Sequence, residues 1–475
     1  MPKRRRAPLP RLPQIVLIAL FALALGTACN GQEPADPSSC LSSGPMLGPA
    51  EMTETTVWLQ TRRPCRAQVR YWKQGGKQGG KEGAQEAARL SPSLETAAEG
   101  DHIARFFLSG LEPGTRYEYE VYLDGFRVGA AYSFQTQAMW RHRADPPAFR
   151  WAIGSCSYIN DAPFDRPGQP YGGDYKIFRS IAVAKPDFMI WLGDNVYYRE
   201  ADWANERDMR RRWAHDRALP EMQPLLGTVH QYAIWDDHDF GANDADRTYR
   251  HRETSLRVFQ DYWANPTYGL AEAPGVFTRF DWADVDFFLL DDRYHRSPNR
   301  MPEGPDKRMF GREQLQWLKE SLAGSQATFK VVAGGNQFWN PMVFYEGLGK
   351  FPAEQRELLE FLREARIEGV VFLSGDRHHT ELLKRQEPGM IPLYEFTSSP
   401  LTSGGGRIEK EANNPARVPG TWVTGGVRNF GLVEVSGKPG ARVMTLRTLD
   451  ADGKELWKHE IPQGELRYAQ GESRP

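Results

Sequence analysis

The sequence lacks an excess of charge of either sign. Its 475 residues contain 60 Lys and Arg against 61 Asp and Glu, which leaves a formal net charge of −1 at pH 7. No global field therefore draws the protein to nucleic acid or to anionic membranes, and any anion that it binds must be captured by a local site. After its first thirty residues it also lacks any run that approaches 18 apolar residues, so no later segment is expected to span a bilayer.

The composition is that of a folded protein. Hydrophobic residues make up 40% of the chain and charged residues 25%, and there are 14 Trp, 18 Tyr and 24 Phe. This is far from the aromatic-poor, charge-rich composition of a disordered chain. The length allows a large buried core and, at roughly 150 residues a domain, about three domains.

The first thirty residues predict export. A basic segment over residues 3–11 precedes an apolar run of 12 residues over 15–26, which is too short to cross the hydrocarbon core as a helix. We therefore expect residues 1–30 to be a signal peptide. The run ends in Leu25-Gly26-Thr27-Ala28-Cys29, which resembles a lipobox, although Gly26 stands where Leu is usual. Lipidation of Cys29, with membrane attachment, and plain cleavage both stay open; either one places the protein in the periplasm, on the cell surface or outside the cell.

Cysteine is scarce, with only four residues: Cys29, Cys40, Cys65 and Cys156. In an oxidising compartment Cys40 and Cys65 can pair, which closes a loop of about 25 residues and stabilises the fold by roughly 3 kcal/mol. The alternative is two free buried thiols. Cys156 is then an unpaired thiol in an exported protein, which suggests that it has a specific role.

The next part of the chain predicts a small β domain. Residues 31–40 are rich in Pro, Ser and Asp and are expected to form a tether. Apolar and polar residues alternate over 56–60, 67–71 and 104–108, and 111–119 resembles the corner that introduces a strand in fibronectin-III domains. We expect a fibronectin/Ig-like β-sandwich over 41–137, with a solvated hairpin loop over 73–83.

From residue 149 the pattern changes to an α/β domain, which we expect to extend over 149–465. Short apolar runs that end in polar residues alternate with helical periods such as 311–322 and 353–366. The runs are 150–154, 188–193, 232–235, 285–290, 329–333 and 370–374. Strands buried on both faces of an open sheet have this pattern. Strands over 393–397, 430–435, 442–449 and 455–461 are expected to extend the sheet.

Polar residues gather where four of these segments end, and the carboxyl ends of strands present ligands to a crevice. The four groups are Gly154-Ser155-Cys156, Gly193-Asp194-Asn195-Val196-Tyr197, Trp235-Asp236-Asp237-His238-Asp239 with Asn243-Asp244 behind it, and Ser374-Gly375-Asp376-Arg377-His378-His379. Carboxylates massed this tightly raise each other's pKa unless a cation neutralises them, so they indicate a site for several metal ions. Oxygen donors with few imidazoles suit iron(III), manganese or calcium better than a thiolate-lined structural zinc.

Taken together, the four motifs resemble the alkaline phosphatase D (PhoD-like) family of metallophosphatases, in the family's order over residues 150–400. The resemblance implies a layered α/β/β/α sandwich after an N-terminal β-sandwich. It also implies phosphate-ester hydrolysis, and Fe³⁺ with Ca²⁺ as cofactors, with Mn²⁺ or Zn²⁺ as alternatives.

The resemblance also implies roles for single residues. Asp194 is expected to bridge two metals, with Cys156 and Tyr197 on the iron and Tyr198 as the alternative phenol. Asp237 stands where many metallophosphatases carry a metal-binding Asn. The remaining expected ligands are Asn243, Asp376 and His378, with His379 as the other choice of imidazole.

Two further residues are expected to act on the substrate. His238 can protonate the leaving alkoxide, with Asp236 as its orienting partner. Arg293 follows a strand and can hold a phosphate oxygen, or it can pair with Asp291 or Asp292. Where other metallophosphatases place a His after the strand at Val331, this chain has Gly335-Asn336-Gln337, which leaves the ligands of the second metal open.

The sequence thus predicts a monomeric, exported phosphatase in which a metal-bound hydroxide attacks a phosphate monoester or diester. Two alternatives remain at this stage. One is a nuclease-like phosphodiesterase on the same site, although no specific nucleic-acid partner is expected. The other is a surface-binding protein whose metal cluster is structural.

Overall fold

The fold is built from β-sheets, and the parallel strands at their centres are buried on both faces. The structure is a computed structural model that describes residues 40–75, 88–405 and 409–469. The expected signal peptide, nearly all of the tether and most of the loop expected over 73–83 lie outside these residues. In the described ranges, no helix is both long enough and apolar enough to pass through a membrane.

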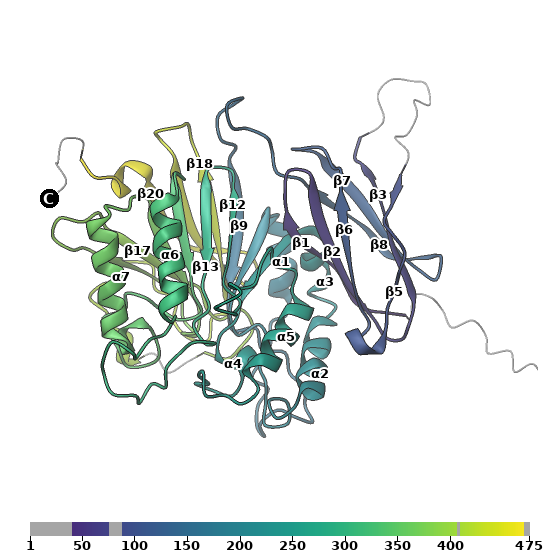
Figure 1. The fold of residues 1–475 in the computed structure, drawn as a ribbon, viewed down its shortest axis with the longest axis horizontal. Helices are drawn as coiled ribbons and strands as arrows, with labels where there is room; N and C mark the ends of the chain where they lie inside the picture. The colour runs from purple at the N-terminus through teal and green to yellow at the C-terminus, as the bar shows by residue number, and fades with distance from the viewer. Residues whose placement is uncertain (1–39, 76–87, 406–408, 470–475) are drawn as a thin grey trace, which may run out of the picture. The chain divides into compact units, whose positions relative to one another are not determined.

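Nine strands form the first sheet (Figure 1). In spatial order they are β20 (Glu455–Pro462), β19 (Val443–Asp450), β18 (Asn429–Ser436), β9 (Phe149–Gly154), β10 (Phe188–Leu192), β11 (His230–Ile234), β1 (Leu41–Ala50), β2 (Glu54–Thr61) and β6 (Ile103–Ser109). Strands β9, β10 and β11 are parallel, so their carboxyl ends meet at one edge.

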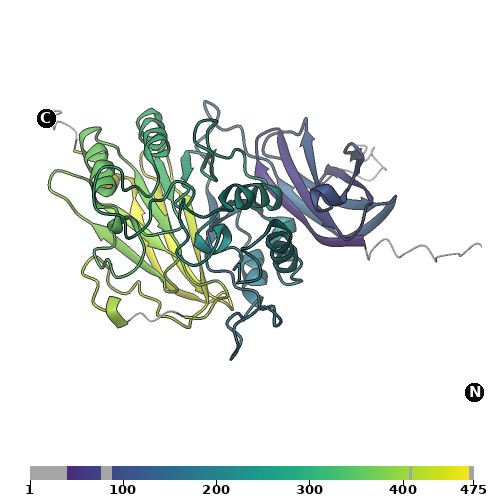
Figure 2. The same cartoon turned by 60° about the horizontal axis from the view of Figure 1, so that its bottom comes forward.

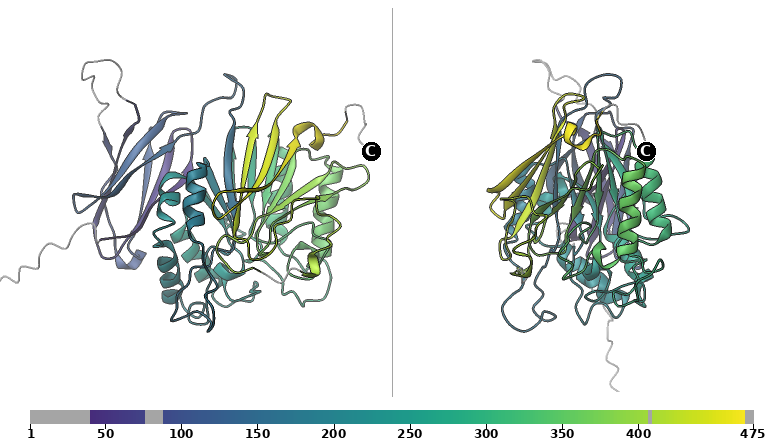
Figure 3. Two further views of the ribbon diagram at one scale, coloured as in Figure 1. Left: turned by 180° about the vertical axis from the view of Figure 1, so that it is seen from behind. Right: turned by 90° about the vertical axis from the view of Figure 1, so that its left-hand side faces the viewer.

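The second sheet has six strands and faces the first. In spatial order they are β12 (Thr278–Trp282), β13 (Val285–Leu289), β14 (Phe329–Ala333), β15 (Val370–Ser374), β17 (Leu393–Thr397) and β16 (Glu381–Arg385). The helices of the described chain are α1 (Lys176–Ala184), α2 (Glu206–Arg217), α3 (Gln223–Thr228), α4 (Asp237–Phe240), α5 (Arg252–Tyr262), α6 (Arg312–Gly324) and α7 (Pro352–Glu364). Figure 3 shows the green helices α6 and α7 side by side on one outer face.

Alternation along the strands explains the layers, because successive side chains of a strand point to opposite faces. In β13, Phe287 packs edge-on against Phe188 of β10, 5.2 Å between ring centroids, and so lies between the two sheets. Its neighbour Phe288 joins the core under α6 and α7. In β10, Trp191 packs against Phe178 of α1 on the opposite face. These contacts confirm the expected α/β/β/α order of layers.

The N-terminal strands form a sandwich that shares a sheet with the α/β domain. One side is β1-β2-β6, and the other contains β4 (Arg89–Leu90), β3 (Arg66–Lys73), β7 (Arg116–Leu123) and β8 (Phe126–Gln135), with β5 (Leu94–Glu95) paired to β3. Cys40 and Cys65 form a disulfide at the edge of its core, as the first of the two alternatives expected. Strand β1 also pairs in parallel with β11, with Leu47 opposite His230.

Most of the expected elements are present, and six strands were not anticipated. Helices α6 and α7 lie within two residues of the predicted ranges 311–322 and 353–366. The strands without a prediction are β1, β4, β5, β8, β12 and β16. The expected boundaries at 137 and 149 stay predictions, since β1 and β2 belong to the sandwich and to the large sheet at once.

Candidate metal centre

The four predicted groups converge on one cavity of about 1380 Å³. They follow β9, β10, β11 and β15. The third group includes α4, and Figure 2 shows the end of the molecule that carries this helix from the front. The predicted residues that line the cavity are Asp194, Tyr197, Asp237, His238, Asn243, Asp376 and His378. Cys156 is completely buried just behind them, hydrogen-bonded to Asp194. Residues far apart in sequence are thus brought together.

The backbone turns sharply at these residues. Cys156, Asp194, Asp376 and His378 all have left-handed conformations, with φ between 52° and 64°. Non-glycine residues adopt this region at an energetic cost, and such positions concentrate at functional sites. Gly193 has a φ of 87°, and a Cβ there would lie 2.8 Å from the backbone nitrogen of Asp236. The turn after β10 therefore requires glycine.

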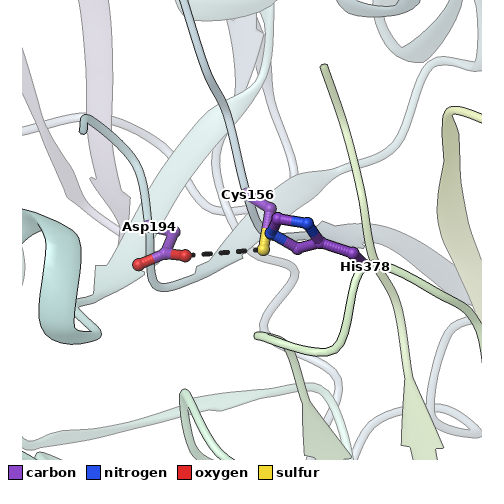
Figure 4. A group of neighbouring side chains, drawn as sticks. All are labelled: Cys156, Asp194 and His378. Atoms are coloured by element: carbon purple, nitrogen blue, oxygen red, sulfur yellow. Dashed lines mark hydrogen bonds between the residues drawn. The ribbon is translucent and has the colours of Figure 1, made fainter. Parts of the chain in front are cut away.

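Cys156, Asp194 and His378 form the first group of ligand atoms (Figure 4). The Cys156 thiol donates a hydrogen bond to the Asp194 carboxylate over 3.6 Å, and Sγ accepts one from the Ser399 hydroxyl at 3.1 Å. One ligand atom from each residue lies within 4.8 Å of the others. Burial raises the pKa of Cys156 to about 11, so the thiol is protonated unless a cation stabilises the thiolate.

A second group shares Asp194 and adds Asp237 and His238. Burial raises the pKa of Asp194 well above its ordinary value, and the nearby charge of Asp237 raises it further. Burial would also raise the pKa of Asp237, but the charges of His238 and Arg293 hold it below its ordinary value. Two metal ions fit this donor set, because bound cations would neutralise the buried anions that otherwise oppose one another.

Two tyrosine hydroxyls contact His378, and these contacts distinguish Tyr197 from Tyr198 and His378 from His379. The Tyr197 hydroxyl lies 3.2 Å from His378 Nε2, and the Tyr171 hydroxyl lies 3.0 Å from Nδ1. Tyr198 is buried elsewhere, where its hydroxyl accepts a hydrogen bond from Trp213. His379 is also buried, 3.3 Å from Glu381 on the far side of its loop. Tyr197 and His378 are therefore the members of each pair that reach the cavity.

Asp239 holds the carboxylate loops together from behind. Its carboxylate accepts backbone hydrogen bonds from Asp194 at 3.1 Å, Asn195 at 2.9 Å and Asp236 at 2.7 Å. Burial raises its pKa to about 7, in spite of these hydrogen bonds. Asp239 is completely buried and does not line the cavity, so it is a positioning residue.

Comparison with known proteins identifies the family. The family model for PhoD-like phosphatase matches residues 151–441, and a domain of unknown function (DUF7800) matches 38–139. The chain belongs to the PhoD-like phosphatase family. It is 23% identical to alkaline phosphatase D of Bacillus subtilis, in a match that covers 66% of this chain and 60% of that protein. It is also 23% identical to human tartrate-resistant acid phosphatase type 5, in a match that covers 67% of this chain and 92% of that protein. It thus spans less than two thirds of the Bacillus relative.

Solved structures of PhoD-like and related proteins show the same fold. A structure of PhoD matches with a TM-score of 0.72 and 17% identity, over 92% of this chain and 94% of that one. A purple acid phosphatase of yellow lupin matches with a TM-score of 0.60 and 12% identity, over 90% and 75%. The resemblance and fold class expected from the sequence are confirmed. Family and fold together support a metal-dependent phosphatase, a hydrolase of phosphoric esters.

Arg293 of this PhoD-like chain takes the second of its two expected roles, as an ion-pair partner of Asp292, and it also pairs with two further carboxylates. It is completely buried and does not line the cavity, so in this arrangement it does not reach a phosphate there. Its guanidinium pairs with Asp236 and with Glu346, the latter at 2.6 Å, and it lies 3.8 Å from Asp292. Asp236 is correspondingly occupied by Arg293 and Asn336 and makes no hydrogen bond with His238. The Asp236 carboxylate therefore fixes Arg293, not the imidazole.

The sequence analysis did not identify four residues that line the cavity: Arg199, Tyr158, Tyr171 and Glu346. Asp244 also lines it; this residue belongs to the third predicted group but was given no role. One signal was available for Arg199, because it lies two residues after Tyr197 and alternate residues of an extended segment face the same way. Tyr158 and Tyr171 come from a loop with no pattern of its own. Glu346 and Asp244 form a further ligand group with Asp237.

Proposed function

We propose that the protein hydrolyses phosphate esters in this cavity with the aid of Fe³⁺ and Ca²⁺. Cys156, Tyr197 and His378 would hold the iron, Asp237 and Asn243 the calcium, and Asp194 both. Asp376 lines the same cavity as His378 and would add a carboxylate ligand. Such cations, when bound, polarise the ester and make water acidic enough to provide hydroxide near neutral pH. The observation that carries the proposal is the convergence of these donors on one cavity.

The protein's own residues prepare the site in three ways. Asp239 and the left-handed turns hold the carboxylates close together in spite of their repulsion. The Tyr171 hydroxyl fixes the orientation of the His378 ring through Nδ1, which leaves Nε2, beside the Tyr197 hydroxyl, for a metal. His238 lines the cavity, and its role in this proposal is to pass a proton to the leaving oxygen.

Turnover assays test this function. Purified protein loaded with iron and calcium is expected to hydrolyse a chromogenic phosphate monoester or diester, and a chelator should abolish turnover. The ratio of monoester to diester rates assigns the ester type, and elemental analysis of the same sample assigns the metals. Metal-loaded protein that turns over neither ester would contradict the proposal and favour the surface-binding alternative.

We also propose export of the mature protein. The Cys40–Cys65 disulfide supports this, because disulfides persist mainly in oxidising compartments. Fractionation of expressing cells should recover the protein outside the cytoplasm. If Cys29 is lipidated, Cys29→Ala moves the protein from the membrane fraction to the soluble fraction; recovery in the cytoplasm would contradict export.

A further inference from the structure

We propose that Arg199 binds the phosphate group of the substrate. This inference rests on the proposed function and replaces the role that the sequence suggested for Arg293. Arg199 lines the cavity, and the residue is only 6% exposed. It comes from the segment after β10 that also supplies Asp194 and Tyr197, so it is positioned by the same turn.

The guanidinium is held in place on one side only. Its Nε donates a hydrogen bond to the Tyr158 hydroxyl at 3.2 Å, and that hydroxyl donates to Asp165 at 2.6 Å. The guanidinium carbon lies over two rings, 4.6 Å from the centre of Tyr158 and 5.4 Å from that of Tyr197. These cation–π contacts and the Nε bond together restrict the position of the guanidinium.

The charge of Arg199 has no carboxylate partner within ion-pair distance among the described residues, and neither terminal nitrogen has a hydrogen-bond acceptor there. Of the other buried arginines in the described chain, Arg217 also lacks a carboxylate partner, but it packs among tryptophan rings and does not line the cavity; the rest are paired. Arg212 lies 3.0 Å from Asp202, Arg293 pairs with Glu346, and Arg442 lies 2.7 Å from Asp284. A buried cation is costly without an anion, so a ligand that carries two phosphate oxygens suits Arg199.

The neighbours of Arg199 place this phosphate at the metal centre. The Tyr197 ring lies under the Arg199 guanidinium, its centre is 4.3 Å from that of the His238 ring, and its hydroxyl lies 3.2 Å from His378 Nε2. A phosphate on Arg199 is thus next to the residue proposed to give the proton and to the ligands proposed for iron. Tyr158 and Asp165 act through Arg199 and are positioning residues.

The test compares Arg199→Gln and Arg199→Lys with the wild type, all loaded with metal. We expect the inhibition constant of inorganic phosphate and the KM of a chromogenic ester to rise about tenfold or more in both variants, since Lys cannot replace a two-pronged contact. Metal content should not change. Arg179→Gln, which removes an exposed charge on α1, is the control and should behave as the wild type.

Two further measurements keep the result decisive. If Arg199→Gln does not fold, Tyr158→Phe removes only the hydroxyl that holds Nε, and it should raise the same two constants by a smaller factor. Calorimetric titration with inorganic phosphate tests Arg199 even if the wild type turns over no ester, so failure of the function and failure of this inference are distinguishable. Unchanged phosphate affinity in Arg199→Gln or Arg199→Lys would overturn the inference.

Discussion

Asp194 belongs to two ligand groups at once, one with Cys156 and His378 and the other with Asp237 and His238. Removal of its charge therefore affects both proposed metals. We expect Asp194→Asn to lose bound metal and to lower kcat by at least about 100-fold, because the proposed metals would supply both the nucleophile and the charge stabilisation.

Elemental analysis and turnover by the same preparation check this prediction. Asp452→Asn is a suitable control, since Asp452 is an exposed residue that pairs with Lys176 far from the cavity. Normal activity and metal content in Asp194→Asn would remove the basis of the assignment.

Asp239 supports the site without lining it. In Asp239→Asn, an amide group would face backbone N–H donors that now have a carboxylate, so at least one buried donor loses its acceptor. We expect a loss of roughly 1–3 kcal/mol in the free energy of unfolding, together with weaker metal binding. Chemical unfolding with and without metal measures both effects; a variant as stable as the wild type would show that Asp239 does not hold the loops.

At the scale of elements, α7 is tied to the segment before α6 by Glu354. The carboxylate accepts backbone hydrogen bonds from Met309 and Phe310, and the residue is 1% exposed. Burial raises its pKa from 4.5 to about 7. The folded state thus binds this proton more tightly than the unfolded state. The contribution to stability is complete below pH 4.5 and is lost as the pH rises through about 7.

The matched variant is Glu354→Gln, which keeps an acceptor oxygen but does not titrate. Between pH 4.5 and pH 8, the free energy of unfolding of the wild type should fall by roughly 3 kcal/mol more than that of the variant. Chemical unfolding across this range measures the difference. A difference independent of pH would show that Glu354 has an ordinary pKa.

The elements of the α/β domain could largely be predicted because their patterns are local. Buried parallel strands such as β14 and β15 read as short apolar runs, and polar residues at their ends mark the site. Arg293 could not be placed in this way, since Asp236 and Glu346, which enclose it, come from distant loops. The pairing of β1 with β11 depends on a tertiary contact for the same reason.

At the scale of the whole molecule, the sandwich and the α/β domain are expected to be one folding unit. Besides the β1–β11 pairing, the Tyr119 hydroxyl donates to the backbone of Gly227, and Trp58 of β2 is buried in the main core. Expression of 138–475 alone should give insoluble protein, because it exposes the edge of β11.

Cleavage of the intact protein is the matched control. Residues 141–145 are exposed between the two parts, and a protease site placed there cuts only the connection. The two fragments should then elute together in gel filtration and keep the melting temperature close to that of the uncut protein. Soluble, stable 138–475 would contradict the single folding unit.

The left-handed backbone conformations in the site limit which amino acids can replace the residues at these positions during evolution. The backbone at Cys156, Asp194 and Asp376 is left-handed, so any residue at these positions must tolerate a positive φ. Val and Ile do not tolerate it for steric reasons and would be eliminated whatever their effect on activity. In a saturation library selected only for soluble expression, Gly and Asn should be the replacements that survive at Asp376. Inactive descendants of this enzyme would therefore be recognised by glycine and asparagine at these turns.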